Sequence, residues 1–347
     1  MRYRLLGRSG LRVSELALGT MTFGTAWGWG ADEATCRAMV DAYAEAGGNF
    51  IDTANNYTDG EAERIVGACV AADRDHFVVA TKFSLTDRRD DPNFGGNGRK
   101  NLVRSLEASL RRLGTDYVDV LWLHMWDFTT PLEEVLRALD DQVRQGKVHH
   151  VGFSDTPAWV VARAVTLAEQ HGWAVPVAVQ VPYSLLDRDI ERELIPMAAE
   201  LDLAVTPWGL LEGGALSGKH LDGDPGEARV GAIGDRTRAV VEVLRDVGTQ
   251  IGATTAQVAL AWVRQRDLGS VMVPILGART VAQLRSNLGV LEVPLPDEAV
   301  ARLDAASGFR PGFPMDFLTG ANVLGLLHGE TAARLHRHRG PHALRAS

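Results

Sequence analysis

The chain has 347 residues, and 36 lysines and arginines stand against 44 aspartates and glutamates, a formal net charge of −8 that disfavours binding to nucleic-acid phosphates. Hydrophobic residues make up 46% and charged residues 23%, the balance of a globular rather than a disordered chain. The two cysteines, Cys36 and Cys69, exclude a disulfide framework and a multi-cysteine metal cage.

The first predicted element is a small hairpin around residues 8–10. Residues 1–7 before it lack the apolar stretch of a signal peptide. No part of the chain approaches the roughly 18 consecutive apolar residues that a membrane-spanning helix needs. The sequence therefore predicts a cytoplasmic protein without membrane contact.

Short apolar runs then alternate with segments of helical period, the pattern of parallel strand–helix units. The predicted strands are 14–19, 49–52, 77–82, 118–124, 148–154, 177–181, 203–207 and 270–275. The predicted helices are 32–46, 62–72, 100–113, 131–146, one that opens at Pro157, 190–200, 236–251, 255–265, 281–288 and 296–306. Residues 209–235 read as a long irregular stretch.

Eight such pairs without a break in composition predict a single α/β domain, a (β/α)8 TIM barrel over residues 1–307 with an N-terminal hairpin cap. The competing fold is an open doubly wound sheet, which usually carries G-x-G-x-x-G after its first strand. No such fingerprint is present. Residues 308–347 form a C-terminal extension, expected to be a loop that partly closes the substrate mouth and ends in a mobile tail.

Polar side chains follow three consecutive predicted strands. Asp52 ends the second, Lys82 the third and His124 the fourth, and Tyr57 follows Asp52. Each alone has a purely structural explanation, but the carboxyl ends of barrel strands are where reactive groups gather. An ammonium beside a phenol favours the phenolate and lowers the phenol pKa, and a carboxylate holds that ammonium in place. The set predicts a site that delivers a proton to a carbonyl group, which an imidazole N–H can orient.

The chain resembles the aldo-keto reductase superfamily, in particular the branch of bacterial-type enzymes and potassium-channel β subunits. The resemblance rests on F-I-D-T-A-N-N-Y, A-T-K, L-W-L-H, G-K-V-H-H-V-G-F-S, Q-V-P-Y-S-L-L-D-R and V-P-I-L-G-A-R-T-V-A-Q-L-R-S-N-L, in this order. It implies that Asp52, Tyr57, Lys82 and His124 are catalytic, with Tyr57 as the proton donor. It also implies NADPH-dependent reduction of an aldehyde or ketone.

The resemblance further implies a nicotinamide cofactor, NADP(H), held without a Rossmann domain. Trp208 matches the aromatic residue that stacks on the nicotinamide, Lys219 a contact of the pyrophosphate, and Arg279 a partner of the 2′-phosphate. The positions that match cofactor contacts are Gly19, Thr20, Met21, Asp52, Ser154, Asp155, Gln180, Trp208, Gly209, Leu210, Leu211, Gly213, Lys219, Gly277, Arg279, Gln283, Ser286 and Asn287.

Three of these positions depart from the family pattern. Asp155 replaces the asparagine of G-x-S-N, and an ionised carboxylate cannot donate a hydrogen bond. Gly209–Leu210 replaces Ser-Pro, and Ser286 replaces a glutamate. We expect these departures to change the affinity for the cofactor and not the type of reaction.

The sequence gives less information about the substrate than about the reaction. Trp27, Trp29, Met125 and Trp126 predict an apolar, aromatic entrance. Such an entrance suits aryl or aliphatic carbonyl compounds, and a keto-sugar or natural-product intermediate is the alternative substrate. A nicotinamide-binding regulatory subunit without turnover is the alternative of another class. No metal site is predicted, because a metal-dependent hydrolase needs more strand-end ligands. The sequence is compatible with a homo-oligomer.

Overall fold

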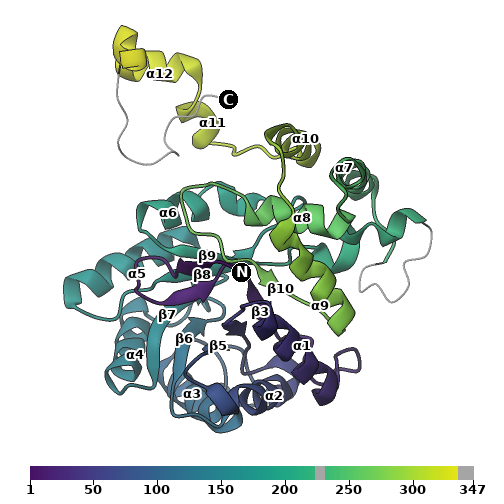
Figure 1. The fold of residues 1–347 in the computed structure, drawn as a ribbon. Coiled ribbons are helices and arrows are strands. Elements are labelled where there is room, and N and C mark those ends of the chain that lie inside the picture. Colours follow the sequence, from purple (N-terminus) through teal and green to yellow (C-terminus); the bar gives the residue numbers. More distant parts are fainter. Residues whose placement is uncertain (223–230, 335–347) are drawn as a thin grey trace. The chain divides into compact units, whose positions relative to one another are not determined.

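The computed structural model describes residues 1–222 and 231–334 (Figure 1). The chain forms two compact units. The barrel unit comprises Met1–Val181, Leu203–Trp208 and Val271–Glu292. The second unit comprises the described parts of Pro182–Asp202, Gly209–Ser270 and Val293–Ser347.

Eight parallel strands form one sheet in the order β10-β3-β4-β5-β6-β7-β8-β9. Their bounds are β3 Ala17–Gly19, β4 Phe50–Asp52, β5 Val78–Phe83, β6 Val118–Leu123, β7 Val148–Ser154, β8 Ala178–Pro182, β9 Ala204–Trp208 and β10 Ile275–Leu276. The two ends of this sheet meet, because Val205 N donates to Val271 O (2.8 Å) and Val273 N donates to Val205 O (2.9 Å). The predicted TIM barrel is confirmed.

The predicted N-terminal hairpin is also present, as β1 (Tyr3–Leu5) paired antiparallel with β2 (Arg12–Ser14). Leu6 and Val13 from it are fully buried in one core cluster with Phe50 and Val78, which begin β4 and β5. The hairpin therefore packs at the amino end of the barrel strands. The predicted catalytic residues lie at the opposite, carboxyl end, together with the loops that follow the strands.

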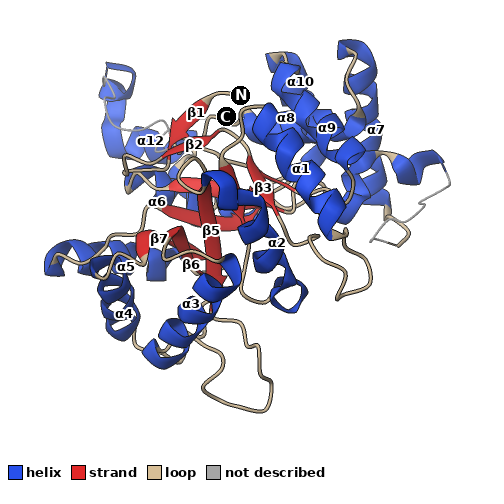
Figure 2. Cartoon of the chain, turned by 60° about the horizontal axis from the view of Figure 1, so that its bottom comes forward, coloured by secondary structure: helices blue, strands red, loops and turns tan. Residues whose placement is uncertain are grey.

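Six α-helices belong to the barrel unit, and α2 to α5 lie outside the strands in Figure 2. Their bounds are α1 Glu33–Glu45, α2 Glu61–Val70, α3 Arg99–Leu113, α4 Leu132–Arg144, α5 Ala158–His171 and α9 Val281–Leu288. Local signals set their ends: Asp32 caps α1 by accepting from Thr35 N, and Gly114 ends α3 in the left-handed conformation that favours glycine. In α4 the buried residues Val135, Leu136 and Leu139 follow the helical period.

The second unit is helical. Its α-helices are α6 Leu194–Glu200, α7 Asp235–Ile251, α8 Thr255–Arg264, α10 Asp297–Ser307, α11 Met315–Leu318 and α12 Ala321–His328. A capping box of Thr254 and Gln257 starts α8. Among the described residues, no helix is long and apolar enough to cross a membrane.

In two predicted elements a proline interrupts the expected regular structure. The predicted helix 190–200 is a short 3-10 turn, η3 (Asp189–Glu191), followed by α6, because Pro196 lacks the N–H that a longer helix would need and fits only in a first turn. The predicted strand 270–275 keeps one bridge at Met272 and the two residues of β10, because Pro274 interrupts the ladder.

Two segments expected to be irregular carry helical turns. The described part of 209–235 contains η4 (Glu212–Ser217) and η5 (Lys219–Asp222). The extension after residue 307 contains α11, α12 and η7 (Gly329–Arg334), where we expected a loop. The predicted mobile tail falls largely on residues 335–347, which lie outside the described residues.

Candidate functional site

The four predicted catalytic residues come together at the carboxyl end of the barrel strands. Asp52 is the last residue of β4, Lys82 lies one residue before the end of β5, and His124 follows β6 directly. Tyr57 opens the 3-10 turn η1 (Tyr57–Gly60), which follows β4. Since neighbouring parallel strands end at the same edge, these side chains share one place in the barrel.

Lys82 is the centre of this cluster. Its Nζ lies 2.5 Å from Asp52 Oδ2, 2.7 Å from Thr53 O and 3.1 Å from Tyr57 Oη. The Lys82 side chain has no exposed surface. These three acceptors match the three N–H donors of an ammonium, so the charge is fully paired in a buried position.

Lys82 and Tyr57 both keep their protons in this cluster. Burial alone would lower the pKa of Lys82, but the neighbouring Asp52 and Tyr57 outweigh it and the pKa lies above its usual value. Burial raises the pKa of Tyr57 more than Lys82 lowers it. Lys82 does lower the pKa of this phenol, as expected, but burial outweighs it and the pKa of Tyr57 lies above its usual value in the protein alone. Tyr57 keeps its proton, as a proton donor must.

His124 is a neutral imidazole. Burial, with a smaller contribution from Lys82, lowers its pKa to about 3. Its ring meets Tyr57 edge to face, with ring centroids 6.1 Å apart. Its Nδ1 is buried without a hydrogen-bond partner among the described residues. A neutral imidazole carries one N–H donor, so His124 can direct a hydrogen bond at a carbonyl oxygen.

Gln180 has a contact that the sequence did not indicate. It lies on β8 in register with Ser154 of β7, and its Nε2 donates to Asp52 Oδ1 (2.9 Å). Both oxygens of Asp52 are thus bound, one by Gln180 and the other by Lys82. A carboxylate only accepts, so the amide oxygen of Gln180 faces away from Asp52. The contact between Gln180 and Asp52 follows from the strand register, which the sequence does not show.

The predicted cofactor residues after β3 line the same edge. Gly19 pairs with Asp52, and the N–H and hydroxyl of Thr20 both donate to Asp52 O (3.0 Å each). Met21 follows with 36% of its surface exposed. The backbone of β4 and the segment after β3 are therefore fixed to one another.

Asp155 and Trp208 form a pair across the ends of β7 and β9. Trp208 Nε1 donates to Asp155 Oδ1 (3.4 Å), and Trp208 is 41% exposed, so its ring is open to a ligand. Burial raises the pKa of Asp155. Asp155 has φ 42°, the left-handed region that aspartate and asparagine tolerate best among residues with side chains.

The predicted phosphate-binding segment lies between β10 and α9. A Cβ at Gly277 would meet no atom within 4 Å, and Asn287 Nδ2 donates to Gly277 O (3.2 Å). Arg279 N donates to Gln283 Oε1 (2.9 Å), and Thr280 caps α9 by accepting from Gln283 N. Ser286 lies on α9. The backbone is thus held beside open space at the amino end of a helix, which suits an anion.

Four other predicted cofactor positions and Lys219 belong to the second unit. Gly209 and Gly213 adopt positive φ (75° and 62°), Leu210 is buried and Leu211 is half-buried. Lys219 begins η5 and lines a hollow of about 570 Å³ with Gly218, Arg245 and Thr254.

The predicted substrate residues lie on the loops at the same end of the barrel. Trp27 and Trp29 face each other with centroids 5.7 Å apart, and Trp27 Nε1 donates to Asp59 Oδ1 (3.4 Å) in the turn that carries Tyr57. Met125 is 44% exposed, and Trp126 N donates to Asp155 O (3.4 Å).

Several polar atoms beside the cluster carry no internal hydrogen bond. Buried atoms without a partner among the described residues include Thr53 Oγ1, Asn55 Oδ1 and Asn56 Oδ1, as well as His124 Nδ1. Such atoms are rare in folded proteins, and a bound ligand or water can supply the missing partner. Together with the open space at Gly277 and the exposed ring of Trp208, they fit a polar cofactor and a carbonyl substrate.

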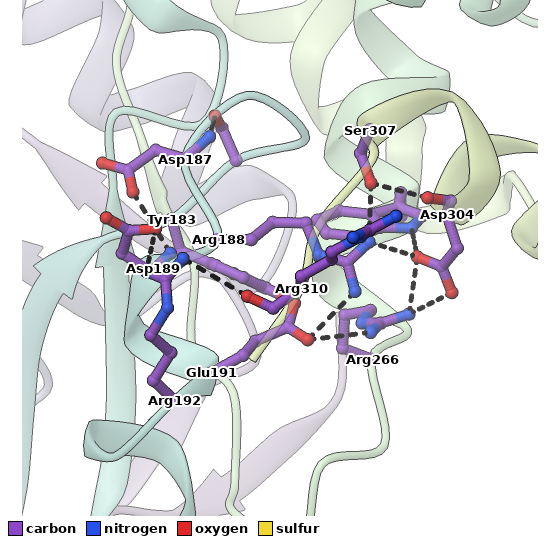
Figure 3. Close-up of polar contacts among 12 residues, drawn as sticks. Tyr183, Asp187, Arg188, Asp189, Glu191, Arg192, Arg266, Asp304, Ser307 and Arg310 are labelled. Atoms are coloured by element: carbon purple, nitrogen blue, oxygen red, sulfur yellow. Dashed lines mark hydrogen bonds and ion pairs between the residues drawn. The ribbon is translucent and has the colours of Figure 1, made fainter. Parts of the chain in front are cut away.

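A second polar cluster lies within the second unit (Figure 3). Arg188 binds Glu191 through two hydrogen bonds and Asp304 through a third (3.1 Å). Arg266 binds both oxygens of Asp304 (3.1 and 3.0 Å), and Tyr183 Oη donates to Glu191. Two cations here match two carboxylates, so the cluster is a closed ion-pair network rather than a reactive site.

Comparisons with known proteins agree with this arrangement. A model of the aldo/keto reductase family matches residues 15–307. Norsolorinic acid reductase stcV of Emericella nidulans is 40% identical over 320 residues, which cover 89% of this chain and 82% of that protein. Norsolorinic acid reductase A of Aspergillus parasiticus is 38% identical over 91% of this chain and 84% of that protein. An aryl-alcohol dehydrogenase of Pestalotiopsis microspora is 38% identical over 91% of this chain and 85% of that protein.

Proposed function

Because this chain belongs to the aldo/keto reductase family, we propose that it reduces an aldehyde or ketone to an alcohol with NADPH and with Tyr57 as the proton donor. The chain is an oxidoreductase of that family. The proton-donor role of Tyr57 rests on one arrangement: Lys82 Nζ lies within hydrogen-bond distance of both Asp52 Oδ2 and Tyr57 Oη.

The cluster has a defined task at each atom. Tyr57 Oη gives its proton to the carbonyl oxygen, and the ammonium of Lys82, 3.1 Å away, stabilises the phenolate that remains. Asp52 keeps Lys82 charged and in place. His124 directs its N–H at the same carbonyl oxygen. When bound, the nicotinamide supplies the hydride to the carbonyl carbon.

The test of this role is Tyr57→Phe. We expect kcat to fall by about 10²–10⁴-fold, the usual contribution of a positioned general acid. The affinity for NADPH, measured by the quenching of tryptophan fluorescence, is expected to stay within about twofold of that of the parent protein. Tyr43→Phe is the matched control, because Tyr43 is also buried and its hydroxyl lies within hydrogen-bond distance of Leu16 O (2.7 Å) and Phe50 O (2.9 Å), away from the cluster. Unchanged turnover in Tyr57→Phe would contradict the role.

The choice of NADPH over NADH rests on Arg279, whose backbone is held at the amino end of α9. In Arg279→Ala we expect kcat/KM with NADPH to fall by about 10–100-fold, the range for charge-assisted hydrogen bonds to a phosphate, and kcat/KM with NADH to change little. Arg285→Ala is the control, because Arg285 lies within α9 itself, after the amino end that Arg279 precedes, and its side chain is 67% exposed beside Glu45. An equal loss with both cofactors would exclude a 2′-phosphate contact.

We propose an aryl aldehyde or ketone as the substrate. The support is the Trp27–Trp29 pair and the exposed Met125 at the site, together with the similarity to an aryl-alcohol dehydrogenase. A natural-product or keto-sugar carbonyl is the second candidate. A panel of aryl aldehydes, alkyl ketones and keto-sugars, assayed by NADPH oxidation, ranks these classes by kcat/KM.

The remaining expectations stand as proposals of the same kind. They are a catalytic domain over residues 1–307 with a C-terminal extension, a cytoplasmic location, and a place in the branch of bacterial-type enzymes and potassium-channel β subunits.

A further inference from the structure

Two loops at the carboxyl end of the barrel exchange hydrogen bonds in both directions. Asn97 N donates to Asp127 Oδ2 (2.7 Å), and Asp127 N donates to Asn97 Oδ1 (2.8 Å). Asn97 precedes α3 in the loop after β5, and Asp127 lies in the loop after β6. We name residues 124–130, which follow β6, the rim loop.

The Asn97 side chain is fully committed to this contact. It has no exposed surface, and its Nδ2 donates to Met125 O (2.8 Å) and to Ser84 Oγ (2.9 Å). Both N–H donors and the amide oxygen are therefore used, so the orientation of the amide is fixed. Asp127 in turn accepts from Thr129 N and Thr130 N (2.9 Å each), which shapes the rest of the rim loop.

Ser84 connects this contact to the catalytic cluster. It lies two residues after Lys82 and has φ 116°, a region that residues with a side chain rarely adopt. Gly96 N donates to Ser84 O (2.7 Å), and the backbone N–H of His124 is shared between Phe83 O (2.9 Å) and Ser84 Oγ (3.2 Å). The strained turn is thus held by the loop of Asn97 on one side and by His124 on the other. Strain of this kind persists where the surroundings enforce one geometry.

We propose that Asn97 is a positioning residue that holds His124 and the rim loop in the geometry that binds the carbonyl substrate. The inference rests on the proposed function for the substrate itself. Asn97 acts through Ser84, Met125 and Asp127. Met125 and Trp126, which we predicted to line the substrate entrance, are carried by the segment that Asn97 binds.

The first test is kinetic. In Asn97→Ala we expect kcat/KM for the carbonyl substrate to fall by about 10–100-fold, mainly through a higher KM, because a misplacement near 1 Å costs up to about a hundredfold. The affinity for NADPH stays within about twofold. In Asn97→Asp, which keeps the shape, a carboxylate would face Met125 O, so the loss is at least as large.

Asn49→Ala is the matched control. Asn49 is also buried and also joins two segments, since its Oδ1 accepts from Ser14 N (2.7 Å) and its Nδ2 donates to Arg12 O (3.1 Å), but it precedes β4 at the amino end of the barrel. We expect it to lower stability as much as Asn97→Ala does and to leave KM unchanged. An equal rise of KM in both variants would overturn the proposal.

The second test needs no turnover. Hydrogen exchange of peptides from residues 124–130 is expected to be at least tenfold faster in Asn97→Ala than in the parent or in Asn49→Ala. Unchanged exchange, or faster exchange with unchanged KM, would overturn the positioning role. A parent protein that reduces no carbonyl compound would instead overturn the proposed function, and the exchange result would still decide whether Asn97 holds the rim loop.

Discussion

Lys82 and His124 are buried at neighbouring strand ends, yet burial leaves them in opposite charge states. The Asp52 carboxylate lies 2.5 Å from Lys82 and keeps the pKa of that ammonium above its usual value. Among the described residues no carboxylate pairs with His124, and burial beside a cation lowers its pKa to about 3. The site therefore holds one permanent positive charge and one neutral donor at physiological pH.

The lowered pKa of His124 makes stability depend on pH. Below about pH 6.5 the unfolded chain protonates this histidine while the folded protein does not, so its contribution to stability is present above pH 6.5 and is lost as the pH falls toward 3. We expect the free energy of unfolding to drop by up to about 1.4 kcal/mol per pH unit in this window.

The measurement is urea unfolding at several pH values between 7 and 4.5 for the parent and for His124→Gln. We expect a flatter pH dependence in the variant, because glutamine does not titrate. His150 also has a lowered pKa through burial, and it cancels in this comparison. Identical slopes in the two proteins would contradict the buried neutral state of His124.

At the residue scale, motif and chemistry predict the four catalytic candidates, because their residue types and strand-end positions are visible in the sequence. The balance of the Tyr57 pKa could not be predicted, since it depends on how deeply the hydroxyl is buried. Gln180 against Asp52 and Asn97 against Asp127 also stayed hidden. Both contacts join residues far apart in the sequence, and only strand register and loop course bring them together.

At the scale of elements, the close approach of α2 to α3 depends on a glycine. A Cβ on Gly67 of α2 would lie 2.2 Å from Leu113 O at the end of α3. Because that neighbour is backbone, it cannot rotate away. The spacing of α2 and α3 is therefore set by the absence of a side chain.

Gly67→Ala should lower the free energy of unfolding by about 1–2 kcal/mol. Overpacking costs roughly 1–3 kcal/mol or more, and the better helix propensity of alanine returns up to about 1 kcal/mol. Gly10→Ala is the control, because a Cβ there meets no atom within 4 Å. The check is the urea midpoint of each variant, and a Gly67→Ala protein as stable as the parent would show that the helices can separate freely.

Element positions were predictable where a strong local signal exists, such as Asp32 before α1 or Gly114 after α3. The errors fall at prolines inside apolar segments: Pro196 delays α6 and Pro274 shortens the last strand. Apolar period alone marks both segments as regular, and the missing N–H decides otherwise. The helices after residue 307 were missed because a short segment carries too little periodicity to separate helix from loop.

At the scale of the whole molecule, eight parallel strands in one closed sheet account for the site, because closure brings the ends of β4, β5, β6 and β8 to one face. The sequence predicted this from strand–helix alternation. It did not predict the second unit, whose ion-pair network joins η3, the segment after α8, and α10 through Glu191, Arg266 and Asp304 (Figure 3). Such a network depends on tertiary distances alone.

The burial of Lys82 has a consequence for the chemistry of the protein surface. The sequence contains only four lysines, and Lys82 is shielded from solvent, so reagents that acylate lysine amines can reach Lys100, Lys147 and Lys219. Attachment to a solid support or a dye through amines would therefore spare the proton-delivering centre. An arginine-rich surface thus leaves this protein few points of covalent attachment.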